Sequence, residues 1–375
     1  MQPRVKGFVT QSPGGRKTNT LPLPEPEAAA LSHTLQERIR QEITTAGGWI
    51  PFARYMELAL YAPGLGYYMA GQRRFGAAGD FITAPEMGSV FAAVLARSLT
   101  PYLGRDGILE FGAGSGALAA QLHAYLPDIP YTILDLSPSL QAEQRAVLPT
   151  VRQRQSLPEH WHGVVLANEL LDALPVTVAE KCSDGVLHEL GVIWQEGDFV
   201  WATNPNPLDD ADLAPLQPYA AAWPTGYRTE LCPRATAWLR TIAASLQQGA
   251  LVLVDYGHEA REYYHPQRSM GTLRGYYRHH VLDDPFFWPG LCDLTAHVNF
   301  SDLLDEAANA GLQVAWYGNL ARFLIDHGLP EVYAELLAQA GAEGALALNN
   351  EVKRLTLPQE MGESFKVLVL TRAET

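Results

Sequence analysis

The stretch Ile108-Leu-Glu-Phe-Gly-Ala-Gly-Ser-Gly-Ala117 decides the fold expected of this chain. It is a short apolar segment containing Glu110, then three alternating glycines, then a helix-like run as far as Leu126. When a strand enters a helix through a tight glycine turn, a nucleotide-like ligand can approach the backbone and the helix N-terminus closely. The glycines that would line this approach are Gly112, Gly114 and Gly116.

Two classes of ligand fit such a turn. Gly112, Gly114 and Ala117 satisfy the looser fingerprint of dinucleotide-binding proteins. Glu110 favours S-adenosylmethionine (SAM) instead, because a carboxylate just before the turn would face a cationic ligand and not a pyrophosphate. The close spacing of Gly116 favours SAM as well. On these residues alone, a nicotinamide-dependent oxidoreductase and a glycine turn without a ligand both stay open.

The second predicted strand, 131–135, ends in a further candidate ligand residue, Asp135. In an open α/β sheet, an acid at the tip of the second strand accepts hydrogen bonds from ribose hydroxyls, which SAM and NAD share. Leu136 follows it directly, and Asn168 follows a third apolar strand, 164–167. We therefore expect a cofactor site made by Glu110, the three glycines, Asp135, Leu136 and Asn168.

Strands and helices alternate through most of the chain, which predicts an α/β protein. Such alternation implies a mostly parallel sheet with helices on both faces and with the carboxyl ends of its strands along one edge. The expected strands are 108–111, 131–135, 164–167, 250–255 and 365–371, and the expected helices are 116–126, 138–147 and 233–247.

The rest of the chain divides by composition. We expect a disordered tail (1–29, with a targeting peptide as the alternative), an N-terminal helical layer or lid (30–104), a core (105–175 and 233–375) and a β-rich insertion (176–232). Within these parts we expect helices over 31–46, capped by Ser32, over 51–62 and over 89–102, a hairpin turn at 195–198 and a loop over 204–224.

The segment Asn168-Glu-Leu-Leu-Asp-Ala-Leu-Pro175 carries the candidate catalytic acids, Glu169 and Asp172. On a helical turn these two carboxylates would share a face. Beside a methyl donor they suggest a basic acceptor such as a guanidinium, which stays protonated and needs orientation by a carboxylate. In the alternative, Asp172 caps a helix and Glu169 is solvated. His297 is a candidate proton carrier or a structural histidine.

A polar loop between apolar segments, 79–86, suits a lid over a site and contributes Asp80, Thr83 and Glu86. These residues would otherwise cap the following turn. No stretch has convincing metal-ligand spacing, and the cationic and aromatic run Arg274–His280 lacks it too, so we expect no metal.

Net charge, apolar content and cysteine content limit the kinds of partner and compartment expected for this chain. A net charge of −14 argues against a general nucleic-acid binder and permits an arginine-bearing protein partner. No run of eighteen apolar residues predicts a membrane span. Three scattered cysteines suggest a reducing compartment, here the bacterial cytoplasm. The β-rich insertion is a plausible contact surface for a homodimer.

The order of these segments resembles the MidA family of SAM-dependent methyltransferases. The resemblance rests on Tyr61-Ala-Pro-Gly-Leu-Gly-Tyr-Tyr68, Gly79-Asp-Phe-Ile-Thr-Ala-Pro-Glu86, Glu110–Gly116, Asn168–Pro175, Asp255-Tyr-Gly257, Asp293-Leu-Thr-Ala-His297 and Met361–Lys366. It implies a Rossmann-like class I methyltransferase fold with a mostly parallel seven-strand sheet, an N-terminal helical layer and a β-rich insertion.

The same resemblance implies a cofactor and an acceptor. SAM would lie near Asp80, Thr83, Gly112, Gly114 and Asp135, and the acceptor would be an arginine of a respiratory NADH dehydrogenase (complex I) subunit or a similar protein. A eukaryotic member would work in the mitochondrial matrix. A SAM-binding assembly factor without catalysis is the alternative function. The chain departs from the family loop, which often carries Pro and Arg where Ala113 and Ser115 stand here.

Overall fold

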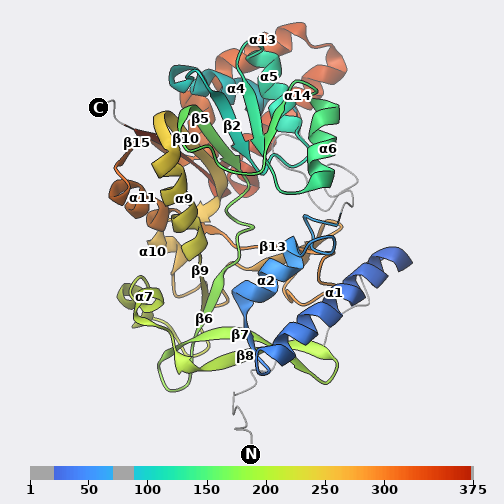
Figure 1. Cartoon of the computed structure of the whole chain (residues 1–375). Helices are drawn as coiled ribbons and strands as arrows, with labels where there is room; N and C mark the ends of the chain where they lie inside the picture. The colour runs from blue at the N-terminus through green and yellow to red at the C-terminus, as the bar shows by residue number, and fades with distance from the viewer. Residues whose placement is uncertain (1–20, 71–87, 373–375) are drawn as a thin grey trace, which may run out of the picture. The chain divides into compact units, whose positions relative to one another are not determined.

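The computed structural model describes residues 21–70 and 88–372, which form two compact units (Figure 1). The first unit contains the described part of Met1–Gln72 together with Ala173–Arg234 and Ala260–His297. The second contains the described part of Arg73–Asp172 together with Ala235–Glu259 and Val298–Thr375. Among the described residues, no helix is both long and apolar enough to cross a membrane. The finer domain boundaries expected from composition stay predictions.

The second unit is built on an eight-stranded, mostly parallel sheet, so the predicted α/β class is confirmed. Along the sheet the order is β15-β16-β10-β5-β2-β3-β4, with β14 paired to β10. All neighbours from β10 to β4 are parallel, whereas β16 runs antiparallel to both β10 and β15. The strands are β2 (Gly107–Phe111), β3 (Tyr131–Leu134), β4 (Arg152–Arg154), β5 (Trp161–Asn168), β10 (Leu246–His258), β14 (Val298–Asn299), β15 (Leu312–Asn319) and β16 (Phe365–Arg372).

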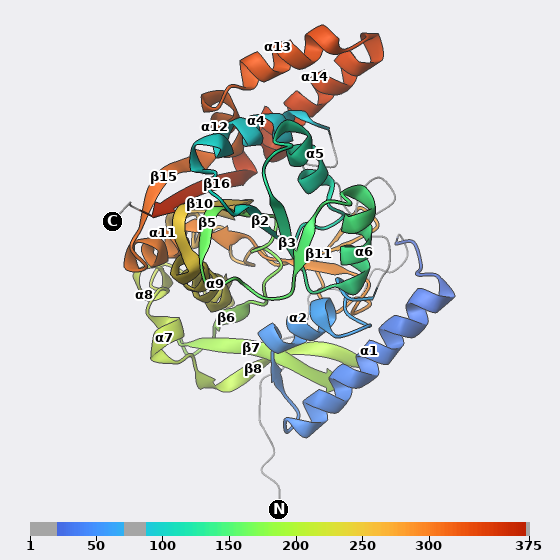
Figure 2. The same cartoon turned by 45° about the horizontal axis from the view of Figure 1, so that its top comes forward.

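Helices cover both faces of this sheet (Figures 1 and 2). They are α4 (Val90–Leu99), α5 (Ala117–Tyr125), α6 (Pro138–Val147), α9 (Pro233–Ser245), α11 (Phe300–Asn309), α12 (Leu320–Asp326), α13 (Leu329–Gln339) and α14 (Ala342–Thr356), with the short turns η2 (Thr100–Tyr102) and η3 (Pro358–Gly362). Figure 2 shows α4 and α12 on one face and α9 and α11 on the other. The guanidinium of Arg240 on α9 donates to both carboxylate oxygens of Glu306 on α11, at 2.7 Å each.

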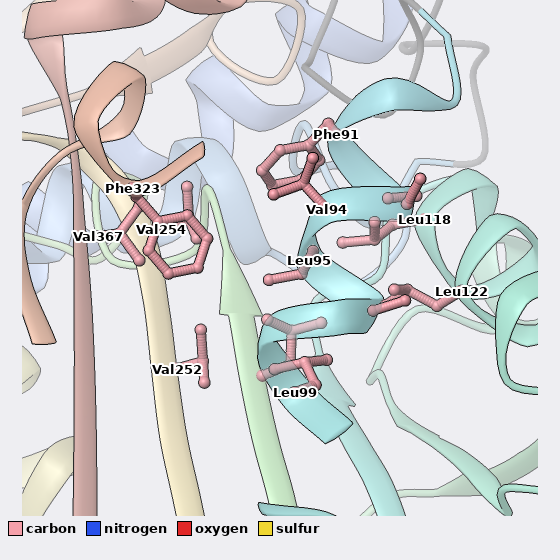
Figure 3. Close-up of a cluster of buried hydrophobic side chains, with 14 of the residues drawn as sticks. Phe91, Val94, Leu95, Leu99, Leu118, Leu122, Val252, Val254, Phe323 and Val367 are labelled. Atoms are coloured by element: carbon pink, nitrogen blue, oxygen red, sulfur yellow. The ribbon is translucent and has the colours of Figure 1, made fainter. Parts of the chain in front are cut away.

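One face of the sheet packs its core against α4 (Figure 3). Val252 and Val254 of β10 are buried in one cluster with Leu95 and Phe91 of α4 and with Phe323 of α12. Alternate residues of a strand point to opposite faces, so the buried residues between these valines serve the other face. Because α4 is apolar on nearly all sides, it is buried in the core and does not lie on the surface. Each large side chain buried here stabilises the fold by about 1.5–3 kcal/mol.

The first unit holds two antiparallel sheets, ordered β1-β7-β6-β9, with β8 beside β7, and β12-β11-β13. The strands are β1 (Ile50–Pro51), β6 (Thr177–Lys181), β7 (Leu187–Gln195), β8 (Asp198–Pro207), β9 (Arg228–Leu231), β11 (Arg274–Tyr277), β12 (His280–Leu282) and β13 (Asp293–Thr295). Its helices are α1 (Pro26–Thr45), α2 (Phe52–Tyr61), α7 (Asp210–Leu213), α8 (Gln217–Ala220) and α10 (Ala260–Tyr263). The predicted hairpin turn is confirmed, with φ of 52° at Glu196 and 91° at Gly197.

Two local expectations are wrong. Helix α1 begins at Pro26, within the predicted tail, because proline suits the first helical turn. Ser32 therefore lies inside the helix, where its hydroxyl is buried, and does not cap it. The predicted loop 204–224 contains the end of β8 and the helices α7 and α8, since Leu208, Leu216 and Trp223 anchor this segment in a buried cluster.

Candidate cofactor and active site

The tips of three neighbouring strands lie at one level of the sheet. Phe111, at the end of β2, pairs with Leu134 of β3 and with Ala167 of β5. Because these pairs are parallel, the residue after each partner reaches the same carboxyl edge, where open α/β sheets bind ligands. Those next residues are Gly112, Asp135 and Asn168. The edge predicted from the sequence is thus present.

The glycine turn after β2 has a backbone that side chains disfavour. Gly112, Gly114 and Gly116 have φ of 60°, 52° and 84°. A Cβ on Gly116 would lie 3.2 Å from the Cα of Gln144, and a Cβ on Gly112 would lie 2.7 Å from Leu170 Cδ1. The positive dihedral angles therefore favour glycine at all three positions, and the turn leads directly into α5 at Ala117.

Glu110 lies inside the sheet next to this turn. Its side chain is 2% exposed, and the Tyr131 hydroxyl of β3 donates to its Oε2 at 2.9 Å. Burial raises the pKa of this carboxyl to about 8, which the nearby Asp135 charge also favours and the Tyr131 hydrogen bond opposes. At pH 7 Glu110 is accordingly mostly protonated, which differs from the carboxylate that we expected. A cation bound nearby would lower this pKa.

Asp135 directly follows β3 and accepts hydrogen bonds from neutral donors. Its Oδ1 accepts from the Ser137 N–H at 2.9 Å, and its Oδ2 accepts from Gln144 Nε2 at 2.8 Å. Burial raises the pKa of Asp135, while these hydrogen bonds lower it. The neighbouring Leu136 is 64% exposed and presents apolar surface beside this edge. Apolar surface of this kind suits a flat heteroaromatic ring.

The segment after β5 is a turn and not the helical turn that we expected. Glu169 has φ of 51°, a rare conformation for a residue with a side chain, and its N–H donates to Val254 O of β10 at 2.8 Å. The reason is Asp255, whose Oδ2 accepts from the backbone N–H groups of Leu170 (3.2 Å), Leu171 (2.8 Å) and Asp172 (3.4 Å). These bonds wrap the chain around a buried carboxylate. The expectation that Glu169 and Asp172 share a helix face is therefore wrong.

The side-chain oxygen of Asn168 is a candidate contact for a bound ligand. Its Nδ2 donates to Glu169 Oε1 at 3.2 Å, whereas its buried Oδ1 has no hydrogen-bond partner among the described residues. A buried carbonyl oxygen without a partner costs free energy unless a ligand satisfies it. An ammonium or hydroxyl group of a bound molecule fits this oxygen.

The other predicted site residues are His297, Asp80, Thr83 and Glu86. His297 belongs to the first unit, where its backbone N–H donates to Thr272 Oγ1 at 3.0 Å. In the same unit the Tyr68 hydroxyl donates to buried Asp293 at 2.9 Å. Asp80, Thr83 and Glu86 fall outside the described residues. Among residues 21–70 and 88–372, no group of three or more His, Cys, Asp or Glu side chains could hold a metal ion.

Comparison with known proteins shows the family and the cofactor of this chain. Residues 91–318 match a family of S-adenosyl-L-methionine-dependent methyltransferases. A protein from Burkholderia thailandensis, bound to S-adenosyl-homocysteine in its crystal structure, is 42% identical, with a TM-score of 0.89 over 94% of this chain and 95% of that one. The chain belongs to the MidA family of SAM-dependent methyltransferases.

Its curated relatives in this family are mitochondrial proteins. The zebrafish protein arginine methyltransferase NDUFAF7 is 27% identical over 90% of this chain and 87% of its own length. The mouse protein of the same name is 30% identical over 86% and 81%. The protein is thus a methyltransferase with SAM as its cofactor, and the nicotinamide alternative is set aside.

The residues at the carboxyl edge fit SAM. The glycine backbone allows close approach, Asp135 keeps lone pairs for sugar hydroxyls, and Asn168 Oδ1 needs a donor. Sequence reasoning missed Gln144 and Tyr131, which bind Asp135 and Glu110. A signal for Gln144 exists in retrospect, because an amide replaces an apolar residue in the buried stripe of α6 between Leu140 and Leu148.

Proposed function

We propose that this methyltransferase transfers the methyl group of SAM to a guanidinium nitrogen of a protein arginine. One observation carries the proposal: the acidic turn at Glu169 is held in a strained conformation by Asp255, at the level of the glycine turn. Strain of this kind persists only where the surroundings impose it, and it concentrates at functional sites. The names of the zebrafish and mouse relatives support the same acceptor.

The chemistry requires orientation more than activation. SAM supplies an activated methyl group, since its sulfonium carbon has a neutral thioether as leaving group. A guanidinium is a poor nucleophile with a pKa above about 12, so a carboxylate that pairs with its N–H groups must hold one nitrogen in line. We assign this orientation to Glu169, with Asp172 as the second acid. The role of His297 as proton carrier is kept as a separate prediction.

We also infer that the sheet is that of the Rossmann-like class I methyltransferases, with seven strands on its main path. Support comes from the strand order β15-β16-β10-β5-β2-β3-β4 and from β16, which is antiparallel to both of its neighbours. In this assignment Gly112 to Gly116 and Asp135 form the cofactor side of the site, and Glu169 lies on the acceptor side.

The acceptor protein is proposed to be a respiratory-complex subunit or a similar arginine-bearing protein. A net charge of −14 attracts a cationic partner at long range. The names of the zebrafish and mouse relatives support the same class of acceptor. For a bacterial chain, the sequence favours the cytoplasm as the compartment. A dimer formed through the β-rich insertion stays a prediction.

The test is incubation of the full chain with methyl-labelled SAM and host lysate, followed by mapping of the labelled residue by mass spectrometry. We expect label on an arginine and at least a hundredfold loss of turnover in Glu169→Gln, with SAM affinity retained. Glu196→Gln is a matched control, because Glu196 has nearly the same backbone, φ 52°, in an exposed hairpin. Label on another residue type contradicts the arginine proposal, and full turnover in Glu169→Gln favours a SAM-binding assembly factor.

A further inference from the structure

Gln144 is a polar side chain in an apolar position. It lies on α6 between Leu140 and Leu148, one helical turn from each, and is 0% exposed. Burying an amide costs free energy unless its donors and acceptor are satisfied. A leucine here would continue the apolar stripe at no such cost, so the amide must be explained by what it contacts.

The amide of Gln144 joins the glycine turn after β2, the residue after β3, and β4. Its Nε2 donates to Gly114 O of the glycine turn at 3.0 Å and to Asp135 Oδ2 at 2.8 Å. Its Oε1 accepts from Gln153 Nε2 of β4 at 3.2 Å. Gly116 has no side chain, so the glycine turn and α6 can lie close together here. A Cβ on Gly116 would lie 3.2 Å from the Cα of Gln144.

The hydrogen bond to Asp135 restricts the direction of its remaining lone pairs. A carboxylate can accept about four hydrogen bonds. The Ser137 N–H takes one site on Oδ1, and Gln144 takes one on Oδ2. A neutral amide orients the carboxylate and leaves its charge in place, whereas a lysine or arginine would neutralise that charge. The Leu136 N–H also donates to this carboxylate, so about one acceptor position remains for a ligand, and Gln144 helps to fix the orientation of the carboxylate.

We propose that Gln144 is a positioning residue that sets how strongly the site selects the two sugar hydroxyls of the cofactor. It acts through Asp135 and, by its bond to Gly114 O, keeps that carboxylate in register with the glycine turn. This inference rests on SAM binding and on the proposed role of Asp135, but not on the identity of the methyl acceptor. It concerns binding alone and is measurable without turnover.

The first test compares S-adenosyl-homocysteine with its 2′-deoxy and 3′-deoxy analogues by calorimetry on the full chain. We expect the native protein to bind the parent compound at least tenfold more tightly than either analogue. In Gln144→Leu this ratio should fall below threefold, because the carboxylate is no longer oriented. Gln339→Leu, on the exposed end of α13, is the matched control and should keep the native ratio.

The results separate the possible failures. An unchanged ratio in folded Gln144→Leu, with all affinities lowered equally, would mean that Gln144 only supports the fold and would overturn the proposal. A native protein without any preference for the hydroxyls would remove the sugar role of Asp135 itself. Failure to find a methylated arginine would leave these binding ratios untouched, so the two proposals fail independently.

A second variant keeps the test valid if the leucine variant fails to fold. Gln144→Glu has the same shape, but its introduced carboxylate faces Asp135, the Gly114 carbonyl and Gln153, with Glu110 and Tyr131 nearby on β2 and β3. It can donate to Asp135 only when protonated. We therefore expect its affinity and its hydroxyl preference to recover at least fivefold between pH 8 and pH 5.5, relative to the native protein. Equal pH profiles for the two proteins would contradict the inference.

Discussion

Asp255 Oδ2 accepts the backbone N–H of Leu171 at 2.8 Å, in a bond that joins the end of β10 to the turn after β5. The same oxygen lies within 3.4 Å of the N–H groups of Leu170 and Asp172. Asp255 thus acts as an internal template for the turn that presents Glu169. In the sequence, Asp255 ends an expected strand, which places it at the edge of the sheet. The structure shows that its side chain also positions the turn after β5.

Asp255→Ala should unfold more easily and lose turnover. Removing the carboxylate leaves several buried N–H groups without an acceptor, which costs about 3 kcal/mol, and frees the strained turn at Glu169. We expect kcat to fall at least tenfold more than the affinity for SAM. Asp184→Ala removes an acceptor of the Val186 N–H in an exposed turn of the other compact unit and should leave kcat unchanged. Equal kinetics for the two variants would argue against the template role.

The stability of the protein should depend on the ionisation of Glu110 between about pH 4.5 and pH 8. The folded pKa of about 8 lies above 4.5, the ordinary value for a glutamate, so the folded state binds this proton more tightly. The contribution to stability is present in full below pH 4.5 and is lost as pH rises through 8. Between these two pH values the free energy of unfolding of the native protein should fall by about 1.4 kcal/mol per pH unit relative to that of Glu110→Gln. Denaturant unfolding at several pH values measures the difference.

Parallel unfolding curves for the native protein and Glu110→Gln would contradict this assignment. Glu143→Gln, at an exposed position of α6, serves as the control for loss of a carboxyl and should show no such slope against the native protein.

Gly114→Val should abolish SAM binding. Gly114 has φ of 52°, where a β-branched residue is strained, and the added side chain would stand in the turn that the ligand approaches. Calorimetry with SAM measures the loss. Gly185→Val imposes similar strain, φ 81°, at a turn with open space around it and should bind SAM normally. Retained affinity in Gly114→Val would show that the turn is not the site.

Asp135→Ala should weaken SAM binding by tenfold or more and leave the ligand-free melting temperature within a few degrees of the native value. Hydrogen bonds to a charged acceptor contribute about 1.5–3 kcal/mol each, whereas loss of this buried acid relieves part of its own desolvation cost. Asp210→Ala, at an exposed position of α7, is the control. A melting temperature that falls as much without ligand as with it would assign Asp135 a structural role.

Periodicity and turn residues predicted most of the sheet unit. The runs before Gly112, Asp135 and Asn168 are apolar because both faces of a parallel strand are covered, and all three became neighbouring strands. The helices α12 to α14 were not predicted. Their polar faces obscure the pattern, and their few buried residues, such as Phe323 and Leu355, are apparent only once packed.

The sequence by itself determined the ligand edge, because glycines and acids directly after apolar strands must reach it in any parallel sheet. Tertiary structure alone decided the state of the side chains there. Burial inside the sheet raises the pKa of Glu110 despite the hydrogen bond from Tyr131, and Glu169 has a strained backbone because Asp255 comes from a strand far along the chain. Desolvation and long-range hydrogen bonds depend on which residues meet in space, and local sequence carries no record of that.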